Sequence, residues 1–243
     1  MENKEVLTEG SLFADIGGWS LACERAGIKS LWAAEIEKFP MEVMQKHFPH
    51  IKQVGDITKL SGYDLEPVDI ITAGSPCQDF SVANGNRTGL QGKRSGLFCK
   101  AIDILYEMRE ATRGEKPRFF VWENVPGVLS CNGGLDYKEM LQEIVQDKVP
   151  MPGSGKWANA GMVRGREVNC AWRILDAQYW GVPQRRRRLF LVADFGGQLS
   201  EKILFKPESL FGNSTPCENT EKGTAVTAQN CPDTSGASAE RHG

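Results

Sequence analysis

The sequence has few histidines and no closely spaced pair of cysteines, so neither a zinc site nor a disulfide framework is expected. There are three histidines, and the seven cysteines are scattered along the chain without a Cys-x-x-Cys spacing. No stretch approaches the roughly 20 consecutive apolar residues that are needed to span a bilayer. These features predict a metal-free protein of the reducing cytoplasm.

The chain also lacks an excess of positive charge. It has 29 basic and 31 acidic residues, which give a formal net charge of -2. A polyanionic substrate would therefore have to be held by local rather than global charge. The charge totals neither support nor exclude nucleic acid, whereas a hydrophobic content of 40% is ample for a buried core.

What the sequence does have is an alternation of short apolar runs and longer amphipathic runs, from Ser11 to about Phe195. This alternation is typical of βαβ units around a parallel sheet. We expect the first strand to start at Leu12-Phe13. Further strands are expected at 31–34, 68–72, 118–122, 170–175 and 189–193, and helices at 21–26, 39–48, 97–109 and 137–145.

Two segments do not follow this alternation. Residues 150–166 are rich in Gly and Pro, which predicts an irregular surface insertion. Beyond Gly196, polar residues dominate as far as the end of the sequence, which predicts a poorly ordered tail. We therefore expect a catalytic domain over residues 1–195 and a polar tail over residues 196–243.

A candidate nucleotide site lies near the N-terminus. Residues 11–18 (Ser-Leu-Phe-Ala-Asp-Ile-Gly-Gly) suggest a strand, a glycine turn and the start of a helix, where N–H groups can bind a negative group. Taken alone, this pattern is equally that of a plain tight turn. Glu35 follows the next strand, 17 residues beyond Gly18, and Asp56 is expected to end the third strand. The ordered set predicts a ligand that contains adenosine.

A candidate nucleophile follows the strand at residues 68–72. Cys77 lies in a loop bent by Gly74 and Pro76, where a thiol can be exposed. A free cysteine is more often a buried structural residue. The polar neighbours Ser75 and Gln78 favour exposure and hence the nucleophile.

Three motifs resemble, in order and spacing, the signature motifs of cytosine-5 DNA methyltransferases. They are Pro76-Cys77-Gln78, Glu123-Asn124-Val125 and the run Gln-Arg-Arg-Arg-Arg at residues 184–188. The glycine turn, Glu35, Asp56 and Gly96-Leu97-Phe98 also match, so the resemblance covers roughly residues 12–193. Residues 172–194 resemble in particular the enzymes carried by phages and mobile elements.

The resemblance implies an α/β fold of the Rossmann-like S-adenosylmethionine-dependent methyltransferase type, with a mostly parallel sheet and helices on both faces. It also implies the chemistry. Cys77 adds to C6 of a cytosine turned out of duplex DNA, and Glu123 protonates or hydrogen-bonds N3. Arg186 and Arg188 point toward the pocket and orient the base or Cys77. The base that removes the C5 proton is not identified, and water is possible.

The resemblance further assigns binding residues, and residues 78–95 are suited to closing over bound DNA. The residues assigned to S-adenosylmethionine are Phe13, Ile16, Gly17, Gly18, Glu35, Ile36, Asp56, Ile57, Pro76 and Leu97. The residues assigned to double-stranded DNA are Gln78, Ser81, Arg87, Arg94 and Gln184.

The sequence departs from the family pattern in two places. Asp15 stands where the family usually has a third glycine in the turn, which predicts weakened cofactor binding. Residues 196–243 resemble neither the target-recognition region nor the closing motifs of the family. We therefore expect a fragment, or one half of a split enzyme that a C-terminal polypeptide complements.

Two other readings remain open. A tRNA cytosine-5 methyltransferase would share the cysteine and glutamate motifs, although the phage-like stretch disfavours it. An inactive module that binds DNA or a partner would explain Asp15 and the missing motifs. Intact Cys77, Glu123, Arg186 and Arg188 favour an enzyme that marks host or phage DNA, as in restriction-modification.

Overall fold

The computed structural model of the chain describes residues 6–75, 96–181 and 183–205. These residues fall into two compact units, each of which is described by itself. The first contains the described residues up to 175 together with 188–205, and the second contains those between 176 and 187. Nearly all regular structure belongs to the first unit.

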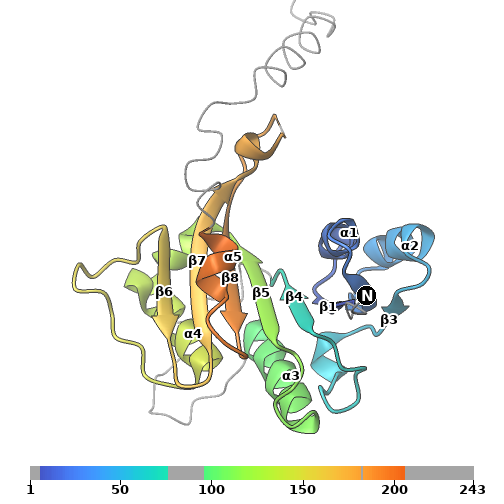
Figure 1. Cartoon of the computed structure of the whole chain (residues 1–243). Helices are drawn as coiled ribbons and strands as arrows, with labels where there is room; N and C mark the ends of the chain where they lie inside the picture. Colours follow the sequence, from blue (N-terminus) through green and yellow to red (C-terminus); the bar gives the residue numbers. More distant parts are fainter. Residues whose placement is uncertain (1–5, 76–95, 182, 206–243) are drawn as a thin grey trace, which may run out of the picture. The chain divides into compact units, whose positions relative to one another are not determined.

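The elements alternate along the chain as a βαβ protein requires (Figure 1). The strands are β1 (Thr8–Leu12), β2 (Lys29–Ala34), β3 (Lys52–Gln53), β4 (Ile70–Ala73), β5 (Phe119–Asn124), β6 (Ala160–Arg164), β7 (Asn169–Asp176) and β8 (Arg187–Asp194). The α-helices are α1 (Gly18–Arg25), α2 (Lys38–His47), α3 (Leu97–Ala111), α4 (Leu135–Val145) and α5 (Ser200–Leu204). Short 3-10 turns are η1 (Ile57–Lys59), η4 (Pro126–Leu129), η5 (Cys131–Gly134) and η6 (Ala177–Trp180).

The eight strands form one sheet in the order β3-β2-β1-β4-β5-β8-β7-β6. The pairs from β3 to β5 are parallel. β8 runs antiparallel to β5, and β6 runs antiparallel to β7. This arrangement confirms the predicted α/β fold with a mostly parallel sheet, and it brings the carboxyl ends of β1, β2, β4 and β5 to one edge.

Helices cover both faces of the sheet, as consecutive residues of β2 demonstrate. Trp32 and Ala34 belong to the main core together with buried residues of α3 and α4. Ala33, between them, packs instead in a second cluster with Met44 and Phe48 from α2 and its end. Alternate residues of a strand point to opposite faces, so α2 and α3 lie on opposite sides of the sheet.

The face beneath α1 buries polar groups. Glu9 and Ser11 of β1 and Thr72 of β4 are all buried. The Thr72 hydroxyl donates to Glu9 Oε1 at 2.5 Å and contacts Ser11 Oγ at 3.2 Å. In α1, burial and the nearby Glu9 raise the pKa of the Cys23 thiol to about 12. Cys23 is thus an inert packing residue.

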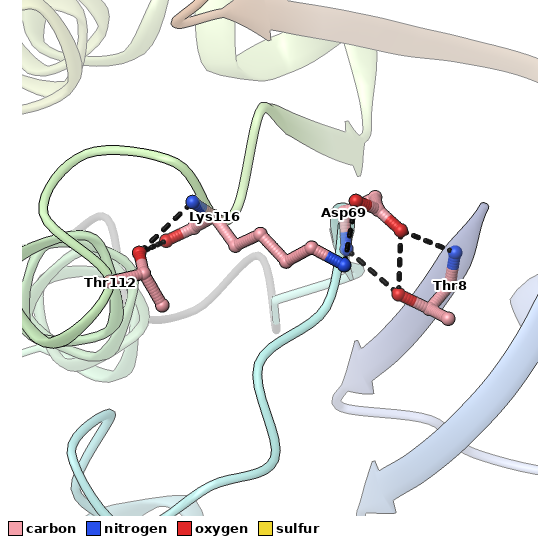
Figure 2. Close-up of polar contacts among 4 residues, drawn as sticks. All are labelled: Thr8, Asp69, Thr112 and Lys116. Carbon is pink, nitrogen blue, oxygen red and sulfur yellow. Dashed lines mark hydrogen bonds and ion pairs between the residues drawn. The ribbon is translucent and has the colours of Figure 1, made fainter. Parts of the chain in front are cut away.

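The opposite edge, where β1 and β4 begin, is held by a polar cluster (Figure 2). Asp69 Oδ2 accepts hydrogen bonds from Thr8 N at 2.8 Å and Thr8 Oγ1 at 2.7 Å, while Lys116 Nζ lies 3.0 Å from Asp69 Oδ1. Thr112 Oγ1 in turn donates to Lys116 O and accepts from Lys116 N. The cluster ties the starts of the two central strands to the segment that precedes β5, away from the edge where the candidate site lies.

Several expected elements were misplaced. The first strand ends at Leu12 instead of starting there, because the chain turns at Phe13, whose φ is 58°. The segment 150–166, expected to be irregular, contains β6, which pairs with β7 despite its glycine. Asp56 does not end β3, which stops at Gln53. Residues 196–205 include α5, whereas the rest of the expected tail lies outside the described residues.

The described residues contain neither a membrane-spanning helix nor a cluster of metal-binding side chains. No helix among them is long and apolar enough to cross a membrane. No group of three or more His, Cys, Asp or Glu side chains there is arranged to hold a metal ion.

Candidate functional site

The glycine turn between β1 and α1 has the backbone conformation that its sequence predicts. Gly17 precedes α1 with a φ of 90°, in the left-handed region that favours glycine. A Cβ at Gly17 would also lie 2.4 Å from Met44 Sδ of α2. Gly17 is therefore required for both the turn and the packing of α1 against α2, while a Cβ at Gly18 would meet no atom within 4 Å. The open side of the turn lies at Gly18.

Glu35 joins this turn to the end of β2. Its Oε2 accepts a hydrogen bond from Asp15 N at 2.8 Å, and its Oε1 accepts from Ile36 N at 2.8 Å and from Glu37 N at 3.0 Å. Glu35 directly follows β2, so the carboxyl ends of two adjacent strands are linked through its side chain. The structure thus brings Glu35 and the glycine turn together, as expected from their spacing.

Exposed apolar side chains flank this link. Ile16 is 50% exposed and Ile36 is 65% exposed, which is unusual for isoleucine and leaves an apolar surface beside the Glu35 carboxylate. Phe13 and Leu97, the first residue of α3, are partly buried against the main core. An exposed apolar surface beside a fixed carboxylate suits a ligand with an aromatic ring and hydroxyl groups.

Asp56 has a local role of its own. It precedes η1, where its Oδ1 accepts hydrogen bonds from Thr58 N at 2.9 Å and Thr58 Oγ1 at 2.7 Å. These hydrogen bonds lower the pKa of the partly exposed Asp56 carboxyl. The next residue, Ile57, is buried in the main core.

Glu123 and Arg188 form the second centre of the site. Glu123 lies within β5, and Arg188 lies in the antiparallel β8, where Phe190 is the register partner of Glu123. Arg188 Nε is 2.8 Å from Glu123 Oε1, with both side chains about a quarter exposed, at 25% and 24%. A charge-assisted contact of this length orients the carboxyl group firmly.

The segment between β4 and Pro76 is anchored to β5 by the residue that follows Glu123. Asn124 is buried, its Nδ2 donates to Ser75 O at 3.0 Å, and its Oδ1 accepts from Val125 N at 2.8 Å. Trp122 Nε1 donates to Ser75 Oγ at 3.0 Å. Ser75, which precedes Pro76, is therefore hydrogen-bonded to both residues that flank Glu123. Sequence reasoning quoted Asn124 as part of a motif but gave it no role.

Several predicted site residues lie outside the described residues. They are Pro76, Cys77, Gln78, Ser81, Arg87 and Arg94. Their expected roles remain predictions.

Gln184 and Arg186 belong to the second unit. Both are exposed, and Arg186 N donates to Asp176 Oδ1 at 3.0 Å while Ala177 N donates to Arg186 O at 3.0 Å. Asp176 also precedes η6, where it accepts a hydrogen bond from Gln178 N. Arg186 is thus held within its own unit, whereas Arg188 meets Glu123 in the first. That Arg186 and Arg188 point toward the pocket and orient the base or Cys77 remains a prediction.

Trp19 is a residue of this region that sequence reasoning missed. It lies in the first turn of α1, and its ring packs edge-on against Phe190 of β8 at 6.0 Å between centroids. The side chain therefore reaches from the glycine turn to the strand that carries Arg188. A tryptophan in an amphipathic helix is normally read as a packing residue, so no sequence signal distinguishes this one.

The chain is similar in sequence and in fold to several known proteins. A family model described as C-5 cytosine-specific DNA methylase matches residues 7–148, more than half of the chain. Over 240 residues the chain is 36% identical to a protein of Escherichia phage P1 named DNA N-6-adenine-methyltransferase, covering 86% of this chain and 31% of that protein.

Two further similarities are to a bacterial enzyme and a yeast structure. The type II methyltransferase M2.BsuMI of Bacillus subtilis (strain 168) is 32% identical over 185 residues, covering 75% of this chain and 41% of that enzyme. The crystal structure of the S. pombe Dnmt2 methyltransferase superimposes with a TM-score of 0.55 at 19% identity, covering 80% of this chain and 51% of that one. The likeness to the S. pombe structure, at 19% identity, shows the fold alone. The chain spans about a third to a half of the length of these proteins.

Proposed function

Because this chain belongs to the C-5 cytosine-specific DNA methylase family, we propose that it carries the catalytic part of an enzyme that methylates C5 of cytosine in DNA. The observation that carries the proposal is the 2.8 Å contact between Arg188 Nε and Glu123 Oε1. This contact fixes the carboxyl group of Glu123. The residues on either side of Glu123 are hydrogen-bonded to Ser75, which precedes Pro76-Cys77 in the sequence. The contact supports Glu123 as the acid, while Cys77, the proposed nucleophile, lies outside the described residues.

The residues at the glycine turn fit S-adenosylmethionine as the cofactor. The N-terminus of α1 suits the methionine carboxylate, the Glu35 carboxylate suits ribose hydroxyls, and exposed Ile16 and Ile36 suit adenine. When bound, this cofactor supplies an electrophilic methyl group on a positively charged sulfur. The residues proposed to hold it are Phe13, Ile16, Gly17, Gly18, Glu35, Ile36, Asp56, Ile57, Pro76 and Leu97, with the buried Ile57 acting through its main chain.

The chain's own residues then have to activate a carbon that is a poor nucleophile. Cys77, as the thiolate, forms a bond to C6 of cytosine, and Glu123 hydrogen-bonds or protonates N3, so that the ring electrons become available at C5. After C5 has gained the methyl group, its proton leaves to a base or to water. The C6–sulfur bond then breaks and returns the thiolate. Arg188 holds Glu123 throughout by its contact with Oε1.

The target base has to leave the double helix before this chemistry can occur. We assign the DNA contacts to Gln184 in the second unit and to Gln78, Ser81, Arg87 and Arg94, which lie outside the described residues. Because the relatives are two to three times longer, we propose that further sequence supplies target recognition, either in the same polypeptide or in a complementing C-terminal one.

The printed name of the phage P1 relative raises a second candidate, transfer to the N6 amino group of adenine. An exocyclic amine attacks a methyl donor with its own lone pair and needs no covalent activation by a thiol. The Pro76-Cys77-Gln78 motif of the sequence, together with the Arg188–Glu123 contact, therefore favours cytosine. This chain covers 31% of that relative, so the name describes a much longer protein.

Transfer of a tritiated methyl group tests the proposal directly. Duplex DNA made of inosine and cytosine, duplex DNA made of adenine and thymine, and tRNA are offered in parallel, with and without a complementing C-terminal fragment of a relative. The proposal expects label in the cytosine duplex alone and no label with the Cys77→Ser variant. Cys131→Ser is the matched control, because it replaces a partly exposed thiol outside the proposed machinery. Label in the adenine duplex, or in tRNA alone, would contradict the proposal.

A further inference from the structure

The second unit presents two neighbouring aromatic side chains to solvent. Tyr179 and Trp180, in η6, are 43% and 62% exposed. Gly181, which follows them, has a φ of 82°, and a Cβ there would meet no atom of the described residues within 4 Å. The surroundings of the pair are therefore open. Because tyrosine and tryptophan are enriched where proteins contact their partners, an exposed pair indicates a binding surface.

The hydrogen bonds of Asp176 fix the segment that carries this pair. Its Oδ1 accepts from Gln178 N at 3.3 Å and from Arg186 N at 3.0 Å, while its Oδ2 accepts from Gln178 Nε2 at 3.0 Å. Ala177 N also donates to Arg186 O at 3.0 Å. The two ends of the segment are thus joined, and the aromatic pair lies on a closed loop. A surface that is organised in advance loses less entropy when it binds a partner.

The same segment is positively charged. Residues 176–187 contain three arginines and a single acidic residue, Asp176, whose carboxylate is engaged by N–H groups of the segment itself. Arg185 and Arg186 are exposed. This surplus of positive charge fits a polyanion. Aromatic rings beside arginines are the combination that holds unpaired nucleic acid, because the rings stack on bases and the guanidinium groups bind phosphates.

We propose that Trp180, with Tyr179 beside it, stacks on a DNA base that has lost its pairing partner, and that Arg185 binds a neighbouring phosphate. The inference rests on the proposed function, because a cytosine that leaves the duplex leaves its partner base unpaired and interrupts the stack. An aromatic ring replaces part of the stacking that is lost. Every base has a face on which a ring can stack, so this contact does not depend on the target sequence.

Two fluorescent duplexes of the same sequence test the proposal. In one duplex a single guanine stands opposite an abasic site, and in the other the same guanine is paired with cytosine. Affinity is measured by fluorescence anisotropy at several salt concentrations without cofactor, for Trp180→Ala, Trp180→Phe and Arg185→Gln. Tyr63→Ala is the control for the aromatic ring, since Tyr63 is 53% exposed in the first unit. Arg166→Gln, at an exposed arginine of that unit, is the control for charge.

The wild type is expected to bind the duplex with the unpaired guanine more tightly. Trp180→Ala should weaken binding to that duplex by about 10-fold and abolish the preference, whereas Trp180→Phe should keep most of it because a ring remains. Arg185→Gln should weaken binding to both duplexes and lower the slope of log affinity against log salt concentration by about 1. The two controls should match the wild type, and all melting temperatures should be unchanged.

Wild-type affinity and preference in Trp180→Ala would overturn the stacking contact. So would a Trp180→Ala variant that loses only its binding to a complementing C-terminal fragment, because the aromatic pair would then belong to a protein interface. Covalent capture of the base in duplex DNA that contains 5-fluorocytosine is measured in parallel. A wild-type chain that captures no base, even with a complementing fragment, would contradict the proposed function. A preference for the unpaired guanine that Trp180→Ala abolishes would still support the stacking contact.

Discussion

Arg188 and Glu123 meet at 2.8 Å across an antiparallel pair of strands, β5 and β8, although the motifs that contain them lie far apart in the sequence. Strand β8 enters the sheet beside β5 in the reverse direction, which is what makes the contact possible. A parallel neighbour of β5 would begin at the edge of the sheet where β5 begins, so its first residues would lie far from Glu123. The antiparallel strand is therefore the feature of the fold that completes this centre.

The first prediction concerns this contact. Arg188→Ala should lower the rate of methyl transfer by roughly 10- to 1000-fold, because the acid loses the group that orients it. Arg164→Ala is the matched control, since Arg164 forms a comparable contact with Glu201 at 3.1 Å on a different part of the surface. Equal rates for the two variants, measured with tritiated cofactor, would show that Arg188 does not orient the acid.

The second prediction concerns the anchor of the segment that leads to Cys77. Asn124→Ala removes the hydrogen bonds to Ser75 O and from Val125 N at a buried position. The free energy of unfolding should fall by about 1–3 kcal/mol, and base capture should fall further than this loss of folded protein explains. Urea denaturation and capture assays at a temperature where the variant is fully folded separate the two effects. A stable variant with wild-type capture would refute the anchor.

The third prediction concerns Asp15, which has a φ of 47°. An aspartate tolerates this left-handed conformation less well than glycine, so Asp15→Gly should raise the free energy of unfolding by up to about 1 kcal/mol. It should also tighten S-adenosylmethionine binding, because a carboxylate near the N-terminus of α1 is removed. Asp15→Asn, which removes the charge but keeps the conformation, separates the two causes. Calorimetry that finds unchanged or weaker binding for Asp15→Gly would contradict the prediction.

The fourth prediction concerns pH and Glu9. Burial raises the pKa of this carboxyl above its ordinary value of 4.5, and the hydrogen bond from Thr72 opposes that rise without cancelling it. The folded state therefore keeps a proton that the unfolded state has released, and stability falls as the pH rises from 4.5 through the folded-state pKa. Glu9→Gln should lose this dependence, so its stability relative to the wild type should increase by at most about 1.4 kcal/mol per pH unit in that window. The free energy of unfolding of both proteins is measured by urea denaturation at pH 5 and at pH 8. The same difference between Glu9→Gln and the wild type at both pH values would exclude a protonated Glu9.

Sequence reasoning succeeded where a residue's role depends on its position at a strand end. Glu35 and the glycine turn lie next to each other because parallel strands place their carboxyl ends at one edge, and the Asp15–Glu35 hydrogen bond of 2.8 Å documents that proximity. Strand β6 was missed because Gly and Pro in residues 150–166 suggested an irregular segment. Pairing with β7 overrides that local preference.

Roles that arise from tertiary contacts were not predictable in the same way. Arg186 and Arg188 look equivalent in a run of four arginines, yet Asp176 accepts a hydrogen bond from the backbone N–H of Arg186, whereas Glu123 contacts the side chain of Arg188. Trp19 carries no distinctive local pattern, and its contact with Phe190 becomes visible when α1 and β8 are assembled. Local sequence does not contain the distances on which these assignments depend.

The central claim is that Cys77 forms a bond to C6 of a cytosine held by Glu123. The most direct measurement is the mass of the product formed with S-adenosylmethionine and a duplex that contains 5-fluorocytosine, because fluorine at C5 prevents the elimination that would release the enzyme. The account predicts a denaturation-resistant adduct, located on the peptide that contains Cys77 and absent in Cys77→Ser, while Cys131→Ser forms it normally. An adduct on another cysteine, or none from a complemented chain that binds both cofactor and DNA, would contradict it.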